Sequence, residues 1–256
     1  MTARGKEFEA FAPIFSRAKL PRDGALVVHS GIAALSRAGF RAEAMIETFL
    51  SYVPDGTLLM PTMTWRTVTV ENPDWDELQT PSHTGTMSEI FRTDYAEARS
   101  IHPTHSAAAR GRDAAALLSR HHVDETPVSA KSPYGLLRDR ETTVLMIGVG
   151  LECVTAIHLP EELIALDVYV RPQVETYRCR DRHGVMHQVR TRRHWRLDRD
   201  FPKFGPPLQE RGELEAGTIE GCPYQIVSMR ALLRDVSAAL NNNPRGTLRD
   251  SHPNAA

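Results

Sequence analysis

Thr143-Val-Leu-Met-Ile-Gly-Val-Gly150 is an unbroken apolar run that ends in two glycines. Such a run is typical of a strand that is buried on both faces, which requires a sheet with helices packed on each side. Residues 153–162, Cys-Val-Thr-Ala-Ile-His-Leu-Pro-Glu-Glu, come next, and the apolar side chains change to helical spacing. This stretch therefore predicts a strand-to-helix turn in an α/β protein.

The second half of this stretch contains three candidate catalytic residues. Proline is tolerated only in the first turn of a helix, so Pro160 places His158 at the helix start. The positive end of the helix dipole keeps an imidazole there neutral, and Glu161 is spaced to orient it. Thr155 could cap the helix or contact a developing oxyanion. The alternative is a capping threonine, a surface histidine and a solvated glutamate, and such triples are common at helix starts.

The rest of the chain alternates between strand and helix patterns. We expect helices over residues 7–20, 42–52, 85–99, 113–121 and 227–240, and strands over residues 25–30 and 57–61. This alternation predicts a mainly parallel central sheet flanked by helices. Residues 62–86 are polar and aromatic and form a candidate lid. Residues 169–196 predict an antiparallel C-terminal hairpin on the edge of the sheet, hinged at residues 181–184.

Composition limits the class of protein. The chain has 256 residues, with 31 basic and 32 acidic side chains and a formal net charge of -1. This balance argues against nucleic-acid binding, and the length suits a single domain over residues 1–240. Residues 241–256 contain little to bury and predict a disordered tail. Three cysteines far apart and no long apolar run indicate a soluble cytoplasmic protein without a membrane association.

The motifs present favour base catalysis over other chemistry. We find no glycine-rich nucleotide fingerprint and no serine nucleophile elbow. A histidine base with hydroxyl donors permits acyl transfer from a thioester to an amine, although it does not demand it. Zinc-dependent hydrolysis through His102, His105 and His121 is a further hypothesis. It lacks a third ligand in matching context, and Pro103 forces extended backbone at His102, so we expect no metal.

Several motifs together resemble the aminoglycoside 3-N-acetyltransferase family, the antibiotic N-acetyltransferases that are distinct from the GNAT enzymes. They keep the order of the family and cover roughly residues 25–170. The motifs are Val28-His29-Ser30, Pro54 to Thr62, Thr80-Pro81-Ser82 with Gly85, Glu89 and Phe91-Arg92, Arg99 to Ser106, Ser132 to Gly135, and Thr155 with His158-Leu159-Pro160-Glu161.

The resemblance implies a CoA-dependent N-acetyltransferase, an activity linked to antibiotic resistance. Acetyl would pass from acetyl-CoA to an amino group of an aminoglycoside-like or other small amine, and a homodimer is compatible with it. Three sets of residues follow: catalytic His158, Thr155 and Glu161; cofactor-binding His29, Ser30, Gly31, His105, Ser106 and Ser132; and substrate-binding Glu89, Asp74 and Trp65.

The sequence also departs from the family pattern. Gly31 stands where a second serine is common, and Val154 replaces an asparagine. Acidic residues that would meet a polycationic sugar are scarce in the hairpin, where the basic stretch Arg192-Arg-His-Trp-Arg196 occurs instead. A non-aminoglycoside substrate is therefore an open alternative. Another is a non-catalytic relative that binds acyl-CoA or a small ligand.

Overall fold

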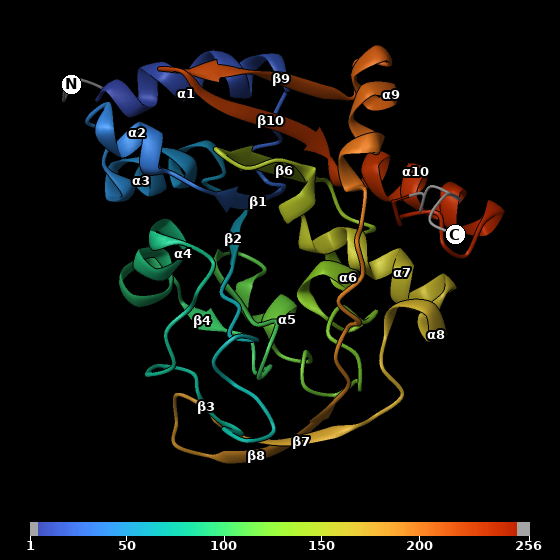
Figure 1. The fold of residues 1–256 in the computed structure, drawn as a ribbon. Coiled ribbons are helices and arrows are strands. Elements are labelled where there is room, and N and C mark those ends of the chain that lie inside the picture. Colours follow the sequence, from blue (N-terminus) through green and yellow to red (C-terminus); the bar gives the residue numbers. More distant parts are fainter. Residues whose placement is uncertain (1–4, 250–256) are drawn as a thin grey trace.

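The computed structural model describes residues 5–249, and its centre is a seven-stranded sheet (Figure 1). β1 (Ala25–Ser30) pairs in parallel with both β2 (Thr57–Pro61) and β6 (Thr142–Ile147). The α/β fold with a central sheet is thus confirmed, and its parallel part is the centre. Antiparallel strands extend both edges, with β5 (Ala107–Gly111) and β4 (Ala98–Arg99) beyond β2, and β10 (Cys222–Ser228) and β9 (Leu214–Ile219) beyond β6.

The central strands are buried on both faces, as the apolar run at residues 143–150 predicts. Successive side chains of a strand point to opposite faces. In β6, Leu145 and Ile147 pack in one apolar core, and Val144 and Met146 pack in the other. These two cores hold the helices against the sheet and fix the positions of the strand ends.

Each core belongs to a different set of helices. The core that contains Leu145 also contains side chains of α1 (Lys6–Arg17), α2 (Ala33–Arg37), α3 (Ala42–Tyr52) and α4 (Thr86–Ile90). The opposite core includes α5 (Ala114–Leu118), α6 (Pro133–Leu137), α7 (His158–Ile164), α9 (Gly205–Glu210) and α10 (Met229–Asn242). The helix expected over residues 85–99 ends early, because a π-helical turn, Phe91–Tyr95, follows α4 and residues 98–99 form β4.

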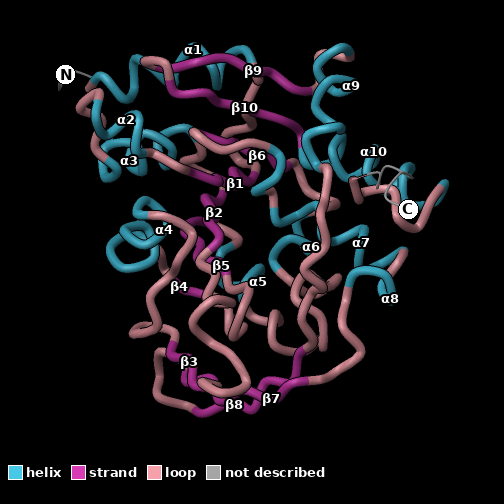
Figure 2. The backbone as a smooth tube through the Cα atoms, in the orientation of Figure 1, coloured by secondary structure: helices cyan, strands magenta, loops and turns pink. Residues whose placement is uncertain are grey.

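A second, three-stranded sheet lies at the other end of the molecule (Figure 1). The predicted hairpin is present as β7 (Glu175–Arg180) and β8 (Met186–Thr191), but its predicted place on the edge of the central sheet is wrong. β7 pairs instead with β3 (Asp74–Asp76), inside the candidate lid segment. Trp75, Tyr177 and Val189 form a small core of its own. The hairpin on the edge of the central sheet is β9–β10, and loops dominate between the two sheets (Figure 2).

The predicted tail is also wrong for residues 241–249. α10 continues to Asn242, and Thr247 and Leu248 after it are buried. Leu248 forms a β-bridge with Arg199, so this segment is attached to the body of the protein. Residues 250–256 lie outside the described residues. Within residues 5–249, no helix is long and apolar enough to cross a membrane.

Candidate active site

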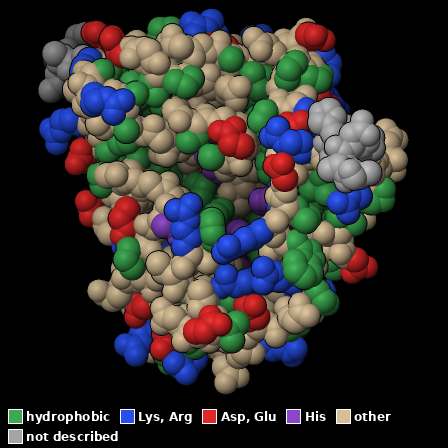
Figure 3. Space-filling model, viewed as in Figure 1, with side chains coloured by type: hydrophobic (Ala, Val, Ile, Leu, Met, Phe, Trp, Pro, Cys, Tyr) green, Lys and Arg blue, Asp and Glu red, His purple; other side chains and the backbone are tan. Residues whose placement is uncertain are grey.

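A cavity of about 1050 Å³ opens beyond the carboxyl ends of the parallel strands. His29 and Ser30 at the end of β1 and Val149 just after β6 form part of its wall. Open α/β sheets bind ligands at this edge, where strand ends meet helix starts. In the space-filling view, histidine side chains lie inside a hollow, and Lys and Arg side chains gather along one rim (Figure 3).

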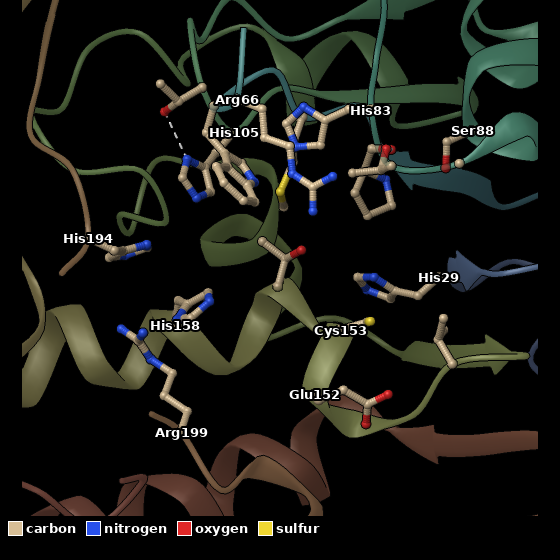
Figure 4. Close-up of a pocket in the computed structure, with 18 of the residues that line it drawn as sticks. His29, Arg66, His83, Ser88, His105, Glu152, Cys153, His158, His194 and Arg199 are labelled. Carbon is tan, nitrogen blue, oxygen red and sulfur yellow. Dashed lines mark hydrogen bonds between the residues drawn. The ribbon is translucent and has the colours of Figure 1, made fainter. Parts of the chain in front are cut away.

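His158 is the first residue of α7 and lies in the cavity wall, as Pro160 in the first turn predicts. Its Nδ1 is 2.7 Å from Oε2 of Glu161. A carboxylate only accepts hydrogen bonds, so Nδ1 carries a proton, and in the neutral ring the opposite nitrogen, Nε2, is the one with the lone pair. In Figure 4 the imidazole lies between the helix and the open pocket. This is the arrangement of a general base oriented by a carboxylate.

Glu161 is completely buried and is held by three other groups. Besides His158, Arg199 Nε donates to both carboxylate oxygens at 3.0 and 3.1 Å, and the Thr247 hydroxyl donates to Oε1 at 2.5 Å. Burial alone would raise the pKa of Glu161, but the positive charge of a protonated His158, the charge of Arg199 and the hydrogen bonds from both residues hold it at about 2. Glu161 therefore remains a carboxylate that can compensate a positive charge on His158.

Thr155 lies one turn before His158 and also lines the cavity. Its hydroxyl is buried, yet it forms no hydrogen bond of normal geometry with any described residue. It faces the hydroxyl of Tyr134, which is equally buried and unsatisfied, and burial raises the pKa of Tyr134. A buried hydroxyl without a partner is unusual, because losing water costs about 1–3 kcal/mol. Thr155 thus supplies a buried hydroxyl beside the cavity that forms no hydrogen bond of normal geometry and lies against the Tyr134 hydroxyl.

His194 stacks on His158, with ring centroids 4.5 Å apart. Its Nε2 is 2.7 Å from Oε1 of Glu162, and His105 packs edge-on against its other side at 5.2 Å. Burial lowers the pKa of both His194 and His105, and burial raises the pKa of Glu162 to about 7. Because the two shifts in the His194–Glu162 pair both disfavour charge, we assign the pair one shared proton and no net charge. The pair thus forms a neutral wall behind His158.

The end of β1 forms the other side of the cavity (Figure 4). His29 Nε2 and Ser30 Oγ are buried without hydrogen-bond partners among the described residues. Burial lowers the pKa of His29 to about 4, so the ring is neutral. Gly31 is next to this wall but does not line the cavity, because it packs against Gly148, and a Cβ at Gly148 would lie 2.1 Å from the Gly31 carbonyl.

These observations test whether a CoA thioester suits the site. A pantetheine arm carries amide and hydroxyl groups, which can satisfy buried polar atoms that have no partner within the protein. His29 Nε2, Ser30 Oγ and Thr155 Oγ1 are three such atoms on one cavity. The residues present therefore fit a long, polar acyl carrier that enters past the end of β1 and reaches His158.

Besides Gly31 and the buried Glu161, four of the predicted site residues do not line this cavity. Ser106 is buried and bonds to Thr62, and Ser132 caps α6 by accepting from Gly135 N. Among the predicted substrate residues only Trp65 lines the cavity. Glu89 pairs with Arg92 at 2.6 Å, and Asp74 pairs with Arg178 of β7. The sequence places these residues near the strand ends but does not reveal the partners that hold them elsewhere.

The metal-site hypothesis conflicts with the hydrogen bonds of its histidines. Nδ1 of His102 accepts from the backbone N–H groups of Thr104 and His105 at 3.2 and 3.0 Å. His121 uses both ring nitrogens, one with Ser100 and one with the Pro127 carbonyl. Nitrogens committed in this way are not free to ligate zinc. Among residues 5–249, no group of three or more ligand side chains is placed to hold a metal ion.

Sequence reasoning missed several residues of the site. Arg199, Thr247, His194 and Glu162 come together only through the tertiary fold, because they lie 32 to 86 positions from their partners. No local motif marks them. The basic stretch at residues 192–196 was the one available signal, and it belongs to the segment that closes the cavity opposite β1.

Comparison with known proteins identifies relatives of this chain. The SPbeta prophage-derived aminoglycoside N(3')-acetyltransferase-like protein YokD of Bacillus subtilis (strain 168) is 27% identical over 157 residues, 53% of this chain and 57% of YokD. The match thus spans little more than half of that relative. The crystal structure of YokD has a TM-score of 0.74 at 20% identity and covers 92% of this chain and 99% of that chain.

Two further structures share the fold. AAC-IIIb in a binary complex with CoASH has a TM-score of 0.76 at 21% identity, covering 97% of this chain and 98% of that chain. AAC-VIa bound to sisomicin has a TM-score of 0.76 at 20% identity, covering 93% and 98%. The model of the family described as aminoglycoside 3-N-acetyltransferase matches residues 27–241. With most of its length matched in this way, the chain belongs to the aminoglycoside 3-N-acetyltransferase family.

Proposed function

We propose that this protein transfers an acetyl group from acetyl-CoA directly to the amino group of an aminoglycoside-like or other small amine, with His158 as the general base. The observation that carries the proposal is the pairing of His158 Nδ1 with the buried Glu161 carboxylate, which leaves Nε2 as the lone-pair nitrogen beside the cavity. Family membership supports the acetyltransferase class, and the CoASH complex of AAC-IIIb supports the use of a CoA thioester.

Each residue has a defined part in the transfer. The thioester supplies an acyl carbon and a thiol leaving group. His158 Nε2 accepts a proton from the amine as its nitrogen forms a bond to the acyl carbon, and the Thr155 hydroxyl donates to the acyl oxygen as negative charge develops there. When the carbon–sulphur bond breaks, His158 returns the proton to sulphur. Glu161 compensates the positive charge on the ring between these two events.

Direct transfer is favoured over a covalent acyl-enzyme. Cys153 is the one cysteine that lines the cavity among the described residues. Burial and the neighbouring Glu152 raise the pKa of its thiol, so it lacks the thiolate character of a nucleophile. The neighbouring carboxylate of Glu152 disfavours the thiolate. The amine must therefore meet the thioester itself.

The alternative is a non-catalytic member of the family that binds acyl-CoA. A thiol-release assay with acetyl-CoA and a panel of amines separates the two, because a binder releases no thiol with any amine. His158→Ala should abolish thiol release while the calorimetrically measured affinity for CoA stays within about twofold of wild type. His183→Ala, in the exposed turn of the β7–β8 hairpin, is the matched control. Equal loss of turnover and CoA binding in His158→Ala would contradict the assignment of a base.

A further inference from the structure

The cavity wall opposite β1 consists of two chain segments that run side by side. Val170 forms an antiparallel bridge with His194, the Arg171 N–H donates to the Arg193 carbonyl at 2.8 Å, and the Trp195 N–H donates to the Tyr169 carbonyl at 2.8 Å. Side chains of residues 171 and 193–196 line the cavity together with Arg199. Backbone pairing thus fixes a row of basic side chains beside His158.

The charges of this wall are not balanced within the protein. Five arginines line the cavity, and Glu152, on the His29 side, is the one carboxylate residue among the described lining residues (Figure 4). Arg193 is paired with Glu175 at 2.9 Å, and Arg199 is paired with Glu161. Arg171 and Arg196 have no carboxylate partner in the part of the chain that the structure describes. The cavity therefore has excess positive charge on the His158 side.

Two guanidinium nitrogens of this wall also lack hydrogen-bond acceptors. Arg171 Nε and Arg199 Nη2 are buried without a partner among residues 5–249. Arg171 lies over the Trp195 ring, with 5.2 Å from Cζ to the centroid. A guanidinium with unused N–H groups can bind carboxylate and phosphate oxygens through two parallel hydrogen bonds. These unused donors are a second observation, independent of the charge count, that indicates an anionic ligand.

We infer that the arginine cluster, Arg171, Arg196 and Arg199, binds an anionic group, a carboxylate or a phosphate-type group, on the acceptor amine. The inference rests on the proposed function and names the substrate class of the same cavity. An amine that carries an anionic group close to its nitrogen binds more tightly through the cluster, and this binding places its nitrogen beside His158. A polycationic aminoglycoside would instead meet like charge in a partly desolvated site.

The position of the cluster assigns the anion to the acceptor rather than to CoA. Arg199 contacts Glu161, and Glu161 contacts His158, so an anion at the cluster lies close to the reacting amine. The phosphates of CoA are separated from the thioester by the whole pantetheine arm. When the thioester is at His158, these phosphates cannot also reach Arg199. The cluster is therefore available to the second substrate.

A matched set of amines tests this inference. The kcat/KM for thiol release is measured with glucosamine, glucosamine 6-phosphate, muramic acid and the polycation kanamycin. We expect at least one of the two anionic amino sugars to exceed glucosamine by about tenfold or more at low salt. In Arg171→Gln and Arg196→Gln, the ratio of anionic to neutral kcat/KM should fall about tenfold. Arg37→Gln, an exposed arginine of α2 outside the cavity, controls for net charge and should keep the wild-type ratio.

Two further experiments test whether the preference for anionic amines comes from the acceptor site or from the phosphates of CoA. Replacing acetyl-CoA by S-acetyl-N-acetylcysteamine removes every CoA phosphate, and the anion preference should persist. The inference is overturned if the anion preference disappears with this short thioester. It is also overturned if kcat/KM is higher with kanamycin than with both anionic sugars. If no amine releases thiol, the proposed function fails, and calorimetric binding decides the inference separately. Tighter binding of glucosamine 6-phosphate or muramic acid than of glucosamine, lost in the Arg171→Gln/Arg196→Gln variant, supports it, and equal binding overturns it.

Discussion

Thr247 and Glu161 are 86 positions apart in the chain, yet the Thr247 hydroxyl donates a 2.5 Å hydrogen bond to Glu161 Oε1. The same hydroxyl is hydrogen-bonded to Tyr169 at 2.7 Å, so the segment after α10 is connected to the start of α7 and the end of α8 (Leu166–Tyr169). Glu161 in turn orients His158. The C-terminal segment thus takes part in positioning the candidate base.

Removing the Thr247 hydroxyl should therefore affect turnover without changing the cavity. Thr247→Val keeps the shape of the side chain and leaves one carboxylate oxygen of a buried Glu161 with fewer donors, which costs about 1–3 kcal/mol. We expect kcat for thiol release to fall about tenfold, with little change in KM for acetyl-CoA. Thr247→Ser restores the hydroxyl and should restore most of kcat. Equal kcat in Thr247→Val and wild type would show that this contact does not orient the base.

The Glu161 carboxylate should make stability depend on acidity. Its pKa is lowered from 4.5 to about 2 in the folded protein, so the stabilisation is fully present above pH 4.5 and is lost as pH falls from 4.5 towards 2. The shift corresponds to about 3 kcal/mol. Urea unfolding at pH 5 and pH 2.5 measures the loss. Glu161→Gln, which does not titrate, should show a smaller loss between these two pH values, and an identical loss would contradict the assignment.

Gly148 should tolerate no side chain. Its φ is 64°, and a Cβ there would lie 2.1 Å from the Gly31 carbonyl, at the point where β1 and β6 end beside the cavity. Gly148→Ala should destabilise the protein by more than about 2 kcal/mol, through the left-handed backbone and the displaced strand end. Gly184→Ala has a similar φ of 81° with nothing within 4 Å, and it should cost about 1 kcal/mol. Equal free energies of unfolding for the two variants would exclude the close approach as the cause.

Cysteine labelling reports access to the cavity. Cys153 is exposed and lines the cavity, whereas Cys179 and Cys222 are buried. One thiol should react with a maleimide in the folded protein, and three should react after unfolding in urea. Because the pKa of the Cys153 thiol is raised, its reaction should be slow at pH 7 and faster at pH 9. Saturating acetyl-CoA should slow it further, and Cys153→Ala should remove the single native label.

Local sequence patterns were sufficient for the elements that form the strand edge of the site. The apolar run at residues 143–147 and the proline at position 160 correctly predicted a doubly buried strand and a helix that begins at His158. Apolar periodicity and the effect of proline on a helix depend on residues a few positions apart, so both can be recognised in the sequence before the fold is known. The same patterns placed His29 and Ser30 at a strand end, and the structure puts both in the cavity wall.

The partners of the site were decided by the tertiary structure. Residues 241–249 contain too few apolar side chains to predict burial, yet Thr247 is buried, and its hydroxyl donates to the buried Glu161 carboxylate. The sequence predicted the β7–β8 hairpin but not its partner strand. The hairpin pairs with β3 instead of the central sheet, and Trp75 of β3 packs in one small core with Tyr177 and Val189 of the hairpin. The sequence by itself determined the strand-to-helix turn and the position of the candidate base, whereas only the tertiary structure decided which charges surround them, because electrostatic partners depend on proximity in space and not along the chain.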